Sequence, residues 1–194
     1  MEAGTEAIPA VEASTGSKTM ADLALLAARK HAGRTAIKHK VGEEWVDIGF
    51  EELGDAVSEI ARGLMALGIE KGDKVSILAH TRPEWTQACF GILTAGGTLV
   101  TIYQTNSPSE CQYVLEHSDS RAVFAEDASQ LEKIREIEGE CPNLEHVIVM
   151  DAEGAELEDA KSLAQLRELG RHRDESDWEA RWSAVSPEDN CLYI

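Results

Sequence analysis

The sequence GDKVSILAHTRPEW, residues 72–85, decides the fold of this chain. It opens on the apolar run Val75–Ala79, which is short enough for a strand buried on both faces. Thr81 then stands before Arg-Pro-Glu, and we expect it to begin a helix through a capping box closed by Glu84. Apolar residues follow at helical spacing over 85–93, and a Gly-Gly pair ends the predicted helix.

Two more strands and a second helix extend this pattern. The run Thr98–Tyr103 indicates a strand, and Ser107-Pro108-Ser109-Glu110 predicts a helix that starts with a capping box. A third strand is predicted over Arg121–Phe124. Strands and helices that alternate through short joins form parallel sheets covered by helices. We therefore predict an α/β fold: a parallel sheet with helices on both faces, preceded by a helix and a β-hairpin.

The remaining segments are expected to surround this sheet. Residues 1–18 show no periodicity and are predicted to be a disordered leader, so the folded part begins at residue 19. Before the sheet we expect a helix from Thr19 to Gly33, a hairpin over 36–40 and 45–48, and an amphipathic helix over 50–67 whose cap, Gly49, is weak. After it we expect a helix over 129–138, a strand over 146–150, an acidic surface loop over 151–160, helices over 162–169 and 174–184, and a strand from Cys191.

The composition argues against several classes of protein. A net charge of −18 opposes nucleic-acid binding, which needs clustered basic residues. It also discourages electrostatic contact with an acidic membrane, and no run approaches the roughly 20 apolar residues of a membrane helix. The start of the chain lacks the cationic and apolar regions of a signal peptide. Four scattered cysteines without a CxxC pair favour reduced thiols in a cytoplasmic protein with a solvated acidic surface.

Three stretches of the sequence resemble the N-terminal region of the adenylate-forming acyl-CoA synthetases. They are GDKVSILAHTRPEW, GILTAGGTLVTIYQTNSP and YVLEHSDSRAVFAED, and they stand in the family's order within residues 19–194. The Arg-Pro-Glu-Trp motif at 82–85 and the Ile-Tyr-x-Thr motif at 102–105 are similar to the long-chain fatty acyl-CoA ligase branch. The resemblance implies a ligase that turns a fatty acid and Mg-ATP into acyl-AMP and pyrophosphate, then transfers the acyl group to CoA. It also allows a homodimer and a peripheral membrane contact through the fatty acid.

The same resemblance implies that the ATP-binding residues lie outside this sequence. In the family, the strand that begins like Cys191–Ile194 leads into a Ser/Thr/Gly-rich loop ending in lysine, whose amides and charge hold phosphate. No such loop occurs here, and Gly96-Gly97 follows a predicted helix and precedes a strand, the reverse of a phosphate-binding turn. We expect residues 19–194 to be the N-terminal portion of an AMP-binding domain, truncated before its phosphate-binding loop, with no catalytic residue and no metal ligand.

Two loops remain as candidate binding sites, because each follows a predicted parallel strand, where ligands of open α/β sheets bind. They are His80-Thr81-Arg82 and Tyr103-Gln104-Thr105-Asn106. By resemblance, the second matches a segment that approaches the CoA nucleotide in acetyl-CoA synthetase relatives, although the Gly-Gly of that segment is absent. Turn formation alone also explains these residue types. The helix over 129–138 offers no candidate, since Lys133 and Arg135 among glutamates predict a solvated face.

Three functional hypotheses stay open. The first is the N-terminal portion of a long-chain fatty acid–CoA ligase, which at full length uses Mg²⁺, ATP and CoA. The second is another adenylate-forming ligase, with an aryl acid as substrate or a carrier protein as acceptor. The third is a non-catalytic α/β binding module. Independent chemistry is not indicated, because no histidine has metal-ligand spacing and no Gly-x-Ser-x-Gly elbow occurs. For the chain by itself we expect no adenylation, and an open sheet with a tendency to associate.

Overall fold

A computed structural model of the chain describes residues 14–194 and contains one six-stranded parallel sheet. Its strand order is β7-β6-β5-β3-β4-β8, and each neighbouring pair runs parallel. The bounds are β3 (Lys74–Leu78), β4 (Thr98–Ile102), β5 (Ser120–Ala125), β6 (His146–Val149), β7 (Lys161–Ser162) and β8 (Leu192–Tyr193). The central strand β3 lies between β5 and β4, so the stretch that decides the fold also occupies the middle of the sheet.

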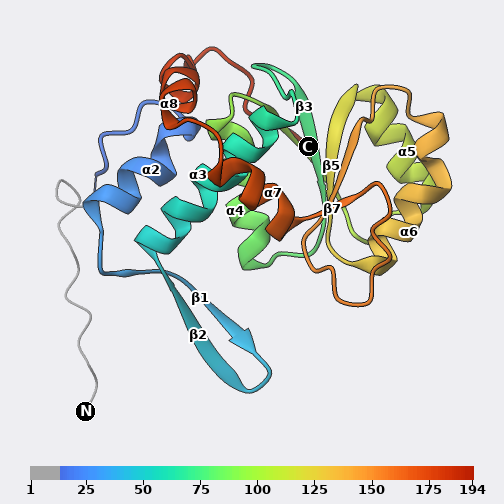
Figure 1. The fold of residues 1–194 in the computed structure, drawn as a ribbon, viewed down its shortest axis with the longest axis horizontal. Coiled ribbons are helices and arrows are strands. Elements are labelled where there is room, and N and C mark those ends of the chain that lie inside the picture. Colours follow the sequence, from blue (N-terminus) through green and yellow to red (C-terminus); the bar gives the residue numbers. More distant parts are fainter. Residues whose placement is uncertain (1–13) are drawn as a thin grey trace.

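Helices cover both faces of the sheet, as predicted, and Figure 1 shows the two layers on either side of it. One layer holds α2 (Met20–Lys30), α3 (Phe50–Ala66), α4 (Pro83–Thr94), α7 (Leu163–Arg171) and α8 (Glu175–Ser183). The other holds α5 (Pro108–His117) and α6 (Ala128–Ile137), which is followed by the short 3₁₀ helix η1 (Glu138–Glu140). The strands are buried on both sides because apolar residues alternate between these two layers: Ile77 packs with the first, and Leu78 with the second.

A two-stranded hairpin stands apart from the main sheet. Its strands β1 (Thr35–Val41) and β2 (Glu44–Gly49) pair antiparallel, and the hairpin projects from the body of the molecule in Figure 1. Gly42 makes the tight turn with φ +60°. The chain then enters α3 directly at Gly49, which caps the helix without a side-chain hydrogen bond, as the sequence predicts.

The main difference from the predicted elements is the start of α4. The expected capping box of Thr81 and Glu84 is wrong: the N-cap is Arg82, and the helix begins at Pro83. Proline favours the first helical position, so the residue directly before it becomes the cap and Glu84 falls one place short of closing a box. The carboxylate of Glu84 instead accepts a hydrogen bond from Nε of Arg82 at 2.7 Å.

Other element boundaries differ by small shifts. The capping box at Ser107 is confirmed, and Gly96 ends α4 with φ +79°. Helix α2 ends at Lys30, before Gly33. The helix expected from Ser162 is α7, which begins at Leu163, and Ser162 is both its N-cap and the last residue of the short strand β7. The predicted disordered leader at 1–18 falls mostly outside the described residues, and 14–18 contain neither helix nor strand.

Three glycines let the helices of the larger layer pack closely against one another. A Cβ atom at Gly170 of α7 would lie 1.8 Å from the carbonyl oxygen of Glu59 in α3. A Cβ at Gly63 of α3 would lie 2.3 Å from the carbonyl oxygen of Leu166, and one at Gly91 of α4 would lie 2.4 Å from Cγ2 of Ile60. Helix α3 is therefore packed closely against both α7 and α4, and a larger residue has no room at these three glycine positions.

We predict that Gly170→Ala destabilises the chain by about 2 kcal/mol or more in urea unfolding. Overpacking usually costs about 1–3 kcal/mol, and a clash with a main-chain oxygen cannot relax by a rotamer change. The better helix propensity of alanine, worth about 1 kcal/mol, offsets only part of this cost. Gly139→Ala is the control, because nothing lies within 4 Å of its Cβ position. Equal stability of the two variants would contradict the close helix crossing.

Candidate functional site

The two candidate loops lie at the same edge of the sheet. His80-Thr81-Arg82 follows β3 and Tyr103–Asn106 follows β4, and these strands are parallel neighbours. The carboxyl ends of parallel strands meet at one edge, which is where ligands of open α/β sheets bind. The structure places both loops at the carboxyl edge of the sheet, as the sequence predicts, and shows that they follow neighbouring strands.

Charged side chains from three neighbouring strand ends surround the first loop. Glu126, after β5, accepts hydrogen bonds from the backbone N–H of His80 at 2.8 Å and pairs with its ring Nδ1 at 2.7 Å. Arg82 lies 2.7 Å from Glu84, 3.6 Å from Glu126 and 3.8 Å from Asp151, which follows β6. One guanidinium thus faces three carboxylates. This loop is held in place by ion pairs, and its cationic group is already neutralised.

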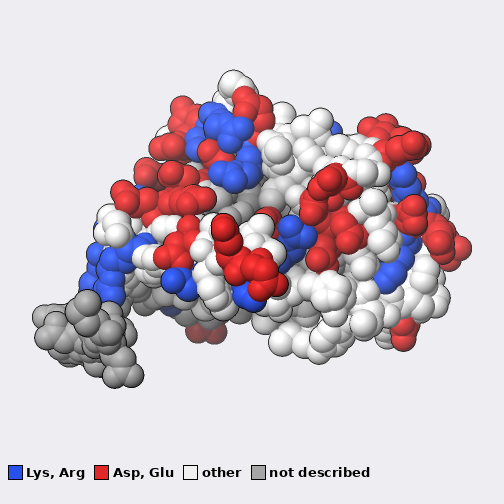
Figure 2. Space-filling model, turned by 90° about the horizontal axis from the view of Figure 1, so that it is seen from below, with Lys and Arg blue, Asp and Glu red and all other residues white. Residues whose placement is uncertain are grey.

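The first loop also forms one wall of a groove of about 600 Å³. The opposite wall is β1 of the hairpin, which contributes Lys38, His39 and Lys40. The two lysines are themselves near acids of the hairpin, since Lys38 lies 3.2 Å from Asp47 and Lys40 lies 3.9 Å from Glu43. Figure 2 shows the molecule from below the view of Figure 1, with acidic side chains spread over this face and basic ones in smaller groups. The groove offers no unopposed positive charge that would select a phosphate.

The second loop forms a turn with an exposed aromatic ring. The backbone N–H of Asn106 donates to the carbonyl oxygen of Tyr103 at 3.0 Å, which closes the turn before the Ser107 cap. The side chain of Tyr103 is 71% exposed, although its neighbour Ile102 is buried in the sheet. Turn formation therefore explains the backbone of this loop, which was one of the two interpretations of its residue types. It does not account for a large aromatic side chain left open to solvent.

Two side chains of α6 bind this turn from the other side, and no pattern in the sequence predicted these contacts. Nζ of Lys133 donates to the carbonyl oxygens of Gln104 and Asn106 at 2.8 Å and 3.0 Å. Nε2 of the buried Gln130 donates to the same Gln104 oxygen at 3.3 Å. The prediction of a solvated face is therefore wrong for Lys133, because α6 passes beneath the turn and directs this lysine into it. Arg135 is also engaged, 3.5 Å from Glu158.

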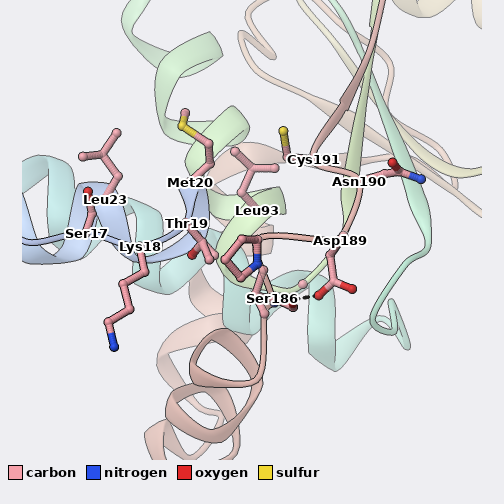
Figure 3. A pocket seen from close by; sticks show the side chains of 15 residues that line it. Ser17, Lys18, Thr19, Met20, Leu23, Leu93, Ser186, Asp189, Asn190 and Cys191 are labelled. Carbon is pink, nitrogen blue, oxygen red and sulfur yellow. Dashed lines mark hydrogen bonds between the residues drawn. The ribbon is translucent and has the colours of Figure 1, made fainter.

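The other end of the sheet carries a second cavity, of about 360 Å³. It lies where β4 begins, between Gly96-Gly97, the start of α2 and the segment before β8 (Figure 3). Its acidic residue, Asp189, accepts from the backbone N–H of Ser186 at 2.8 Å and pairs with Lys71 at 2.7 Å. These contacts satisfy the carboxylate locally and lower the pKa of Asp189, so this carboxylate is not free for chemistry.

The described residues 14–194 do not supply a metal centre. They hold no group of three or more His, Cys, Asp and Glu side chains that could bind an ion. All four cysteines are free, and burial raises the pKa of Cys89 to about 11, which makes it a poor nucleophile. Within the same range, no helix has both the length and the apolar character needed to cross a membrane.

A family model and two similar known proteins place the chain in the same family. A family model described as AMP-binding enzyme matches residues 26–194. The long-chain-fatty-acid–CoA ligase FadD15 of Mycobacterium bovis is 32% identical over 150 residues, which are 77% of this chain and 24% of that protein. The long-chain-fatty-acid–CoA ligase ACSBG1 of Rattus norvegicus is 27% identical over 166 residues, 85% of this chain and 23% of that protein. The chain spans about a quarter of the length of these relatives.

A solved structure shows the same fold. The anthranilate CoA ligase AuaEII, in complex with anthranoyl-AMP, superposes with a TM-score of 0.69 at 22% identity. The match covers 83% of this chain and 30% of that one. At this identity the likeness establishes the architecture of the sheet and its helices, and leaves the acid substrate open.

We predict that Glu126 stabilises the first loop in a pH-dependent way. Burial of the carboxylate opposes ionisation, but hydrogen bonds from His80 and the charges of His80 and Arg82 outweigh it and lower the pKa. A lowered folded pKa adds stability above the ordinary glutamate pKa of about 4.3, and this stability is lost as the pH falls through the folded value. In urea unfolding, Glu126→Gln should therefore lose stability against wild type at pH 7, and the gap should shrink towards pH 3.

The matched control for this measurement is Glu153→Gln, which removes an exposed carboxylate that forms no ion pair with any residue in 14–194. Its stability should follow wild type at both pH values. A gap between Glu126→Gln and wild type that is the same at pH 7 and pH 3 would contradict a role for the ionised carboxylate.

Proposed function

Because the chain belongs to the AMP-binding enzyme family, we propose that it is the N-terminal portion of an AMP-forming acid–thiol ligase acting on long-chain fatty acids. The observation that carries this proposal is the sequence likeness to long-chain-fatty-acid–CoA ligases over most of the chain. The full-length enzyme would join a fatty acid carboxylate to the α-phosphorus of ATP and release pyrophosphate. The thiol of CoA would then attack the acyl carbonyl and release AMP.

Within that enzyme, this chain supplies the scaffold and one side of the acceptor site. The turn Tyr103-Gln104-Thr105-Asn106 is proposed to lie on the CoA side, as the resemblance of this segment implies. Its position supports this role, because it follows a strand at the carboxyl edge of the sheet and exposes the ring of Tyr103 there. Aromatic faces offer stacking surfaces to nucleotide bases. The chain contributes position and shape, while ATP and Mg²⁺ are bound by residues beyond this sequence.

The setting of the protein follows the same proposal. Its four free thiols fit a reducing compartment, so we place the enzyme in the cytoplasm. A homodimer and a peripheral membrane contact through the fatty acid remain part of the proposal as properties of the full-length protein.

We predict that purified residues 1–194 do not catalyse ATP–pyrophosphate exchange with palmitate and Mg²⁺. Adenylation needs the carboxylate aligned on the α-phosphorus and the pyrophosphate charge neutralised, and the proposed function assigns both tasks to other parts of the full-length enzyme. The rate with palmitate should equal that of a control without acid. Exchange above this control would overturn the division of labour proposed for the chain.

We predict that the full-length polypeptide encoded by the gene makes palmitoyl-CoA faster than 4-coumaroyl-CoA. The fold is shared with an aryl acid ligase and does not separate the two substrates. Two curated relatives are named as long-chain-fatty-acid–CoA ligases, and for this reason we expect palmitate to be the better substrate. Thioester formation would be followed with each acid under saturating ATP and CoA. A higher kcat/KM for 4-coumarate would assign the protein to the aryl acid ligases.

A further inference from the structure

We propose that Lys133, assisted by Gln130, is a positioning residue that holds the turn Tyr103–Asn106 in its ligand-binding shape. The ammonium group of Lys133 donates to two carbonyl oxygens of one turn, at 2.8 Å on Gln104 and 3.0 Å on Asn106. The carbonyls of a short exposed turn would otherwise bind water. A single side chain from α6, roughly thirty residues further along the sequence, thus links two carbonyl oxygens of the turn.

The charge of Lys133 makes this arrangement strong and unusual. Hydrogen bonds in which one partner is charged contribute more than neutral ones. Lys133 forms no ion pair with any residue in 14–194, and the hydrogen-bond partners of its ammonium group are the two carbonyl oxygens of the turn. A half-buried lysine used in this way does not serve the folding of α6, which is packed through Leu131, Ile134 and Ile137.

Gln130 strengthens the same contact from within the core. Its side chain is 7% exposed, and its amide nitrogen donates to the Gln104 oxygen at 3.3 Å. Its amide oxygen has no hydrogen-bond partner among the described residues. Burying an amide with one atom unpaired costs free energy. The oxygen of the Gln130 amide is unpaired within residues 14–194, while its nitrogen donates to the turn.

The contacts of Lys133 and Gln130 have a consequence for the side chain of Tyr103. Its ring is 71% exposed, so no packing partner fixes where it points, and its orientation depends on the turn backbone. A preorganised turn avoids the entropy cost of ordering a loop when a ligand binds. If the turn lies on the CoA side, as the proposed function has it, then Lys133 governs CoA affinity and leaves adenylation unaffected.

The first test measures the turn itself in residues 1–194, by amide hydrogen exchange read with NMR. Lys133→Met should speed exchange of the Asn106 amide at least about tenfold, because a charged hydrogen bond is lost while the core stays intact. Lys133→Arg should restore slow exchange, since a guanidinium can also donate to two carbonyls. Lys161→Met is the matched control, because it removes a lysine side chain in β7 whose ammonium group forms no ion pair with any residue in 14–194. Unchanged exchange in Lys133→Met, or loss of global stability equal to the loss at the turn, overturns the positioning role.

The second test measures the ligand in the full-length polypeptide and rests on the proposed function. Lys133→Met should raise KM for CoA about tenfold, leave ATP–pyrophosphate exchange unchanged, and be rescued by Lys133→Arg. A merely structural defect would lower both half-reactions together. An unchanged KM for CoA overturns the assignment of the turn to CoA. If the wild-type polypeptide forms no acyl-CoA, the proposed function fails, while the hydrogen-exchange result still decides whether Lys133 holds the turn.

Discussion

The contact between α3 and α7 at backbone distance is the constraint on which the larger helix layer depends. Gly63 and Gly170 each face a main-chain oxygen of the opposite helix, so the two helices cannot be separated by side chains. Ion pairs add to this contact: the carboxylate of Glu59 in α3 accepts from Arg167 at 2.6 Å and from Arg171 at 3.0 Å, both in α7. Partly buried ion pairs of this kind fix orientation more than they add stability. The result is a rigid layer against which β3 and α4 are placed.

That rigidity reaches the carboxyl edge of the sheet through α4. Helix α4 packs on α3 at Gly91, so its first turn and the preceding His80–Arg82 loop have a fixed position. The smaller layer acts on the next loop in a different way, because α6 directs Lys133 into the turn after β4. Each loop is therefore held by a side chain from an element that follows β5 in sequence: Glu126 for the first loop and Lys133 for the second.

The sequence predicted the elements better than it predicted these contacts. Hydrophobic runs, capping residues and Gly or Pro signals report local structure, which is why the strands from β3 to β6 and the Ser107 cap agree with the structure. The pairing of His80 with Glu126 depends on β5 lying beside β3, and strand order is not written in local periodicity. Lys133 was misjudged for the same reason: among glutamates it has the pattern of a solvated face, and only the path of α6 under the turn shows otherwise. The closeness of α3 and α7 gave no local signal either.

The two loops differ in the charge of the side chains around them. Around the first loop, Arg82 faces Glu84, Glu126 and Asp151, so the group as a whole is negative and repels phosphates. Around the second loop, Lys133 has no acidic partner in ion-pair contact, and the nearby carboxylate of Glu110 is occupied by the Ser107 backbone at 2.7 Å. In a chain of net charge −18, the two loops therefore differ in their local charge. The proposed CoA side is the β4 side of the edge, where Tyr103 is exposed and Lys133 has no ion-pair partner among residues 14–194.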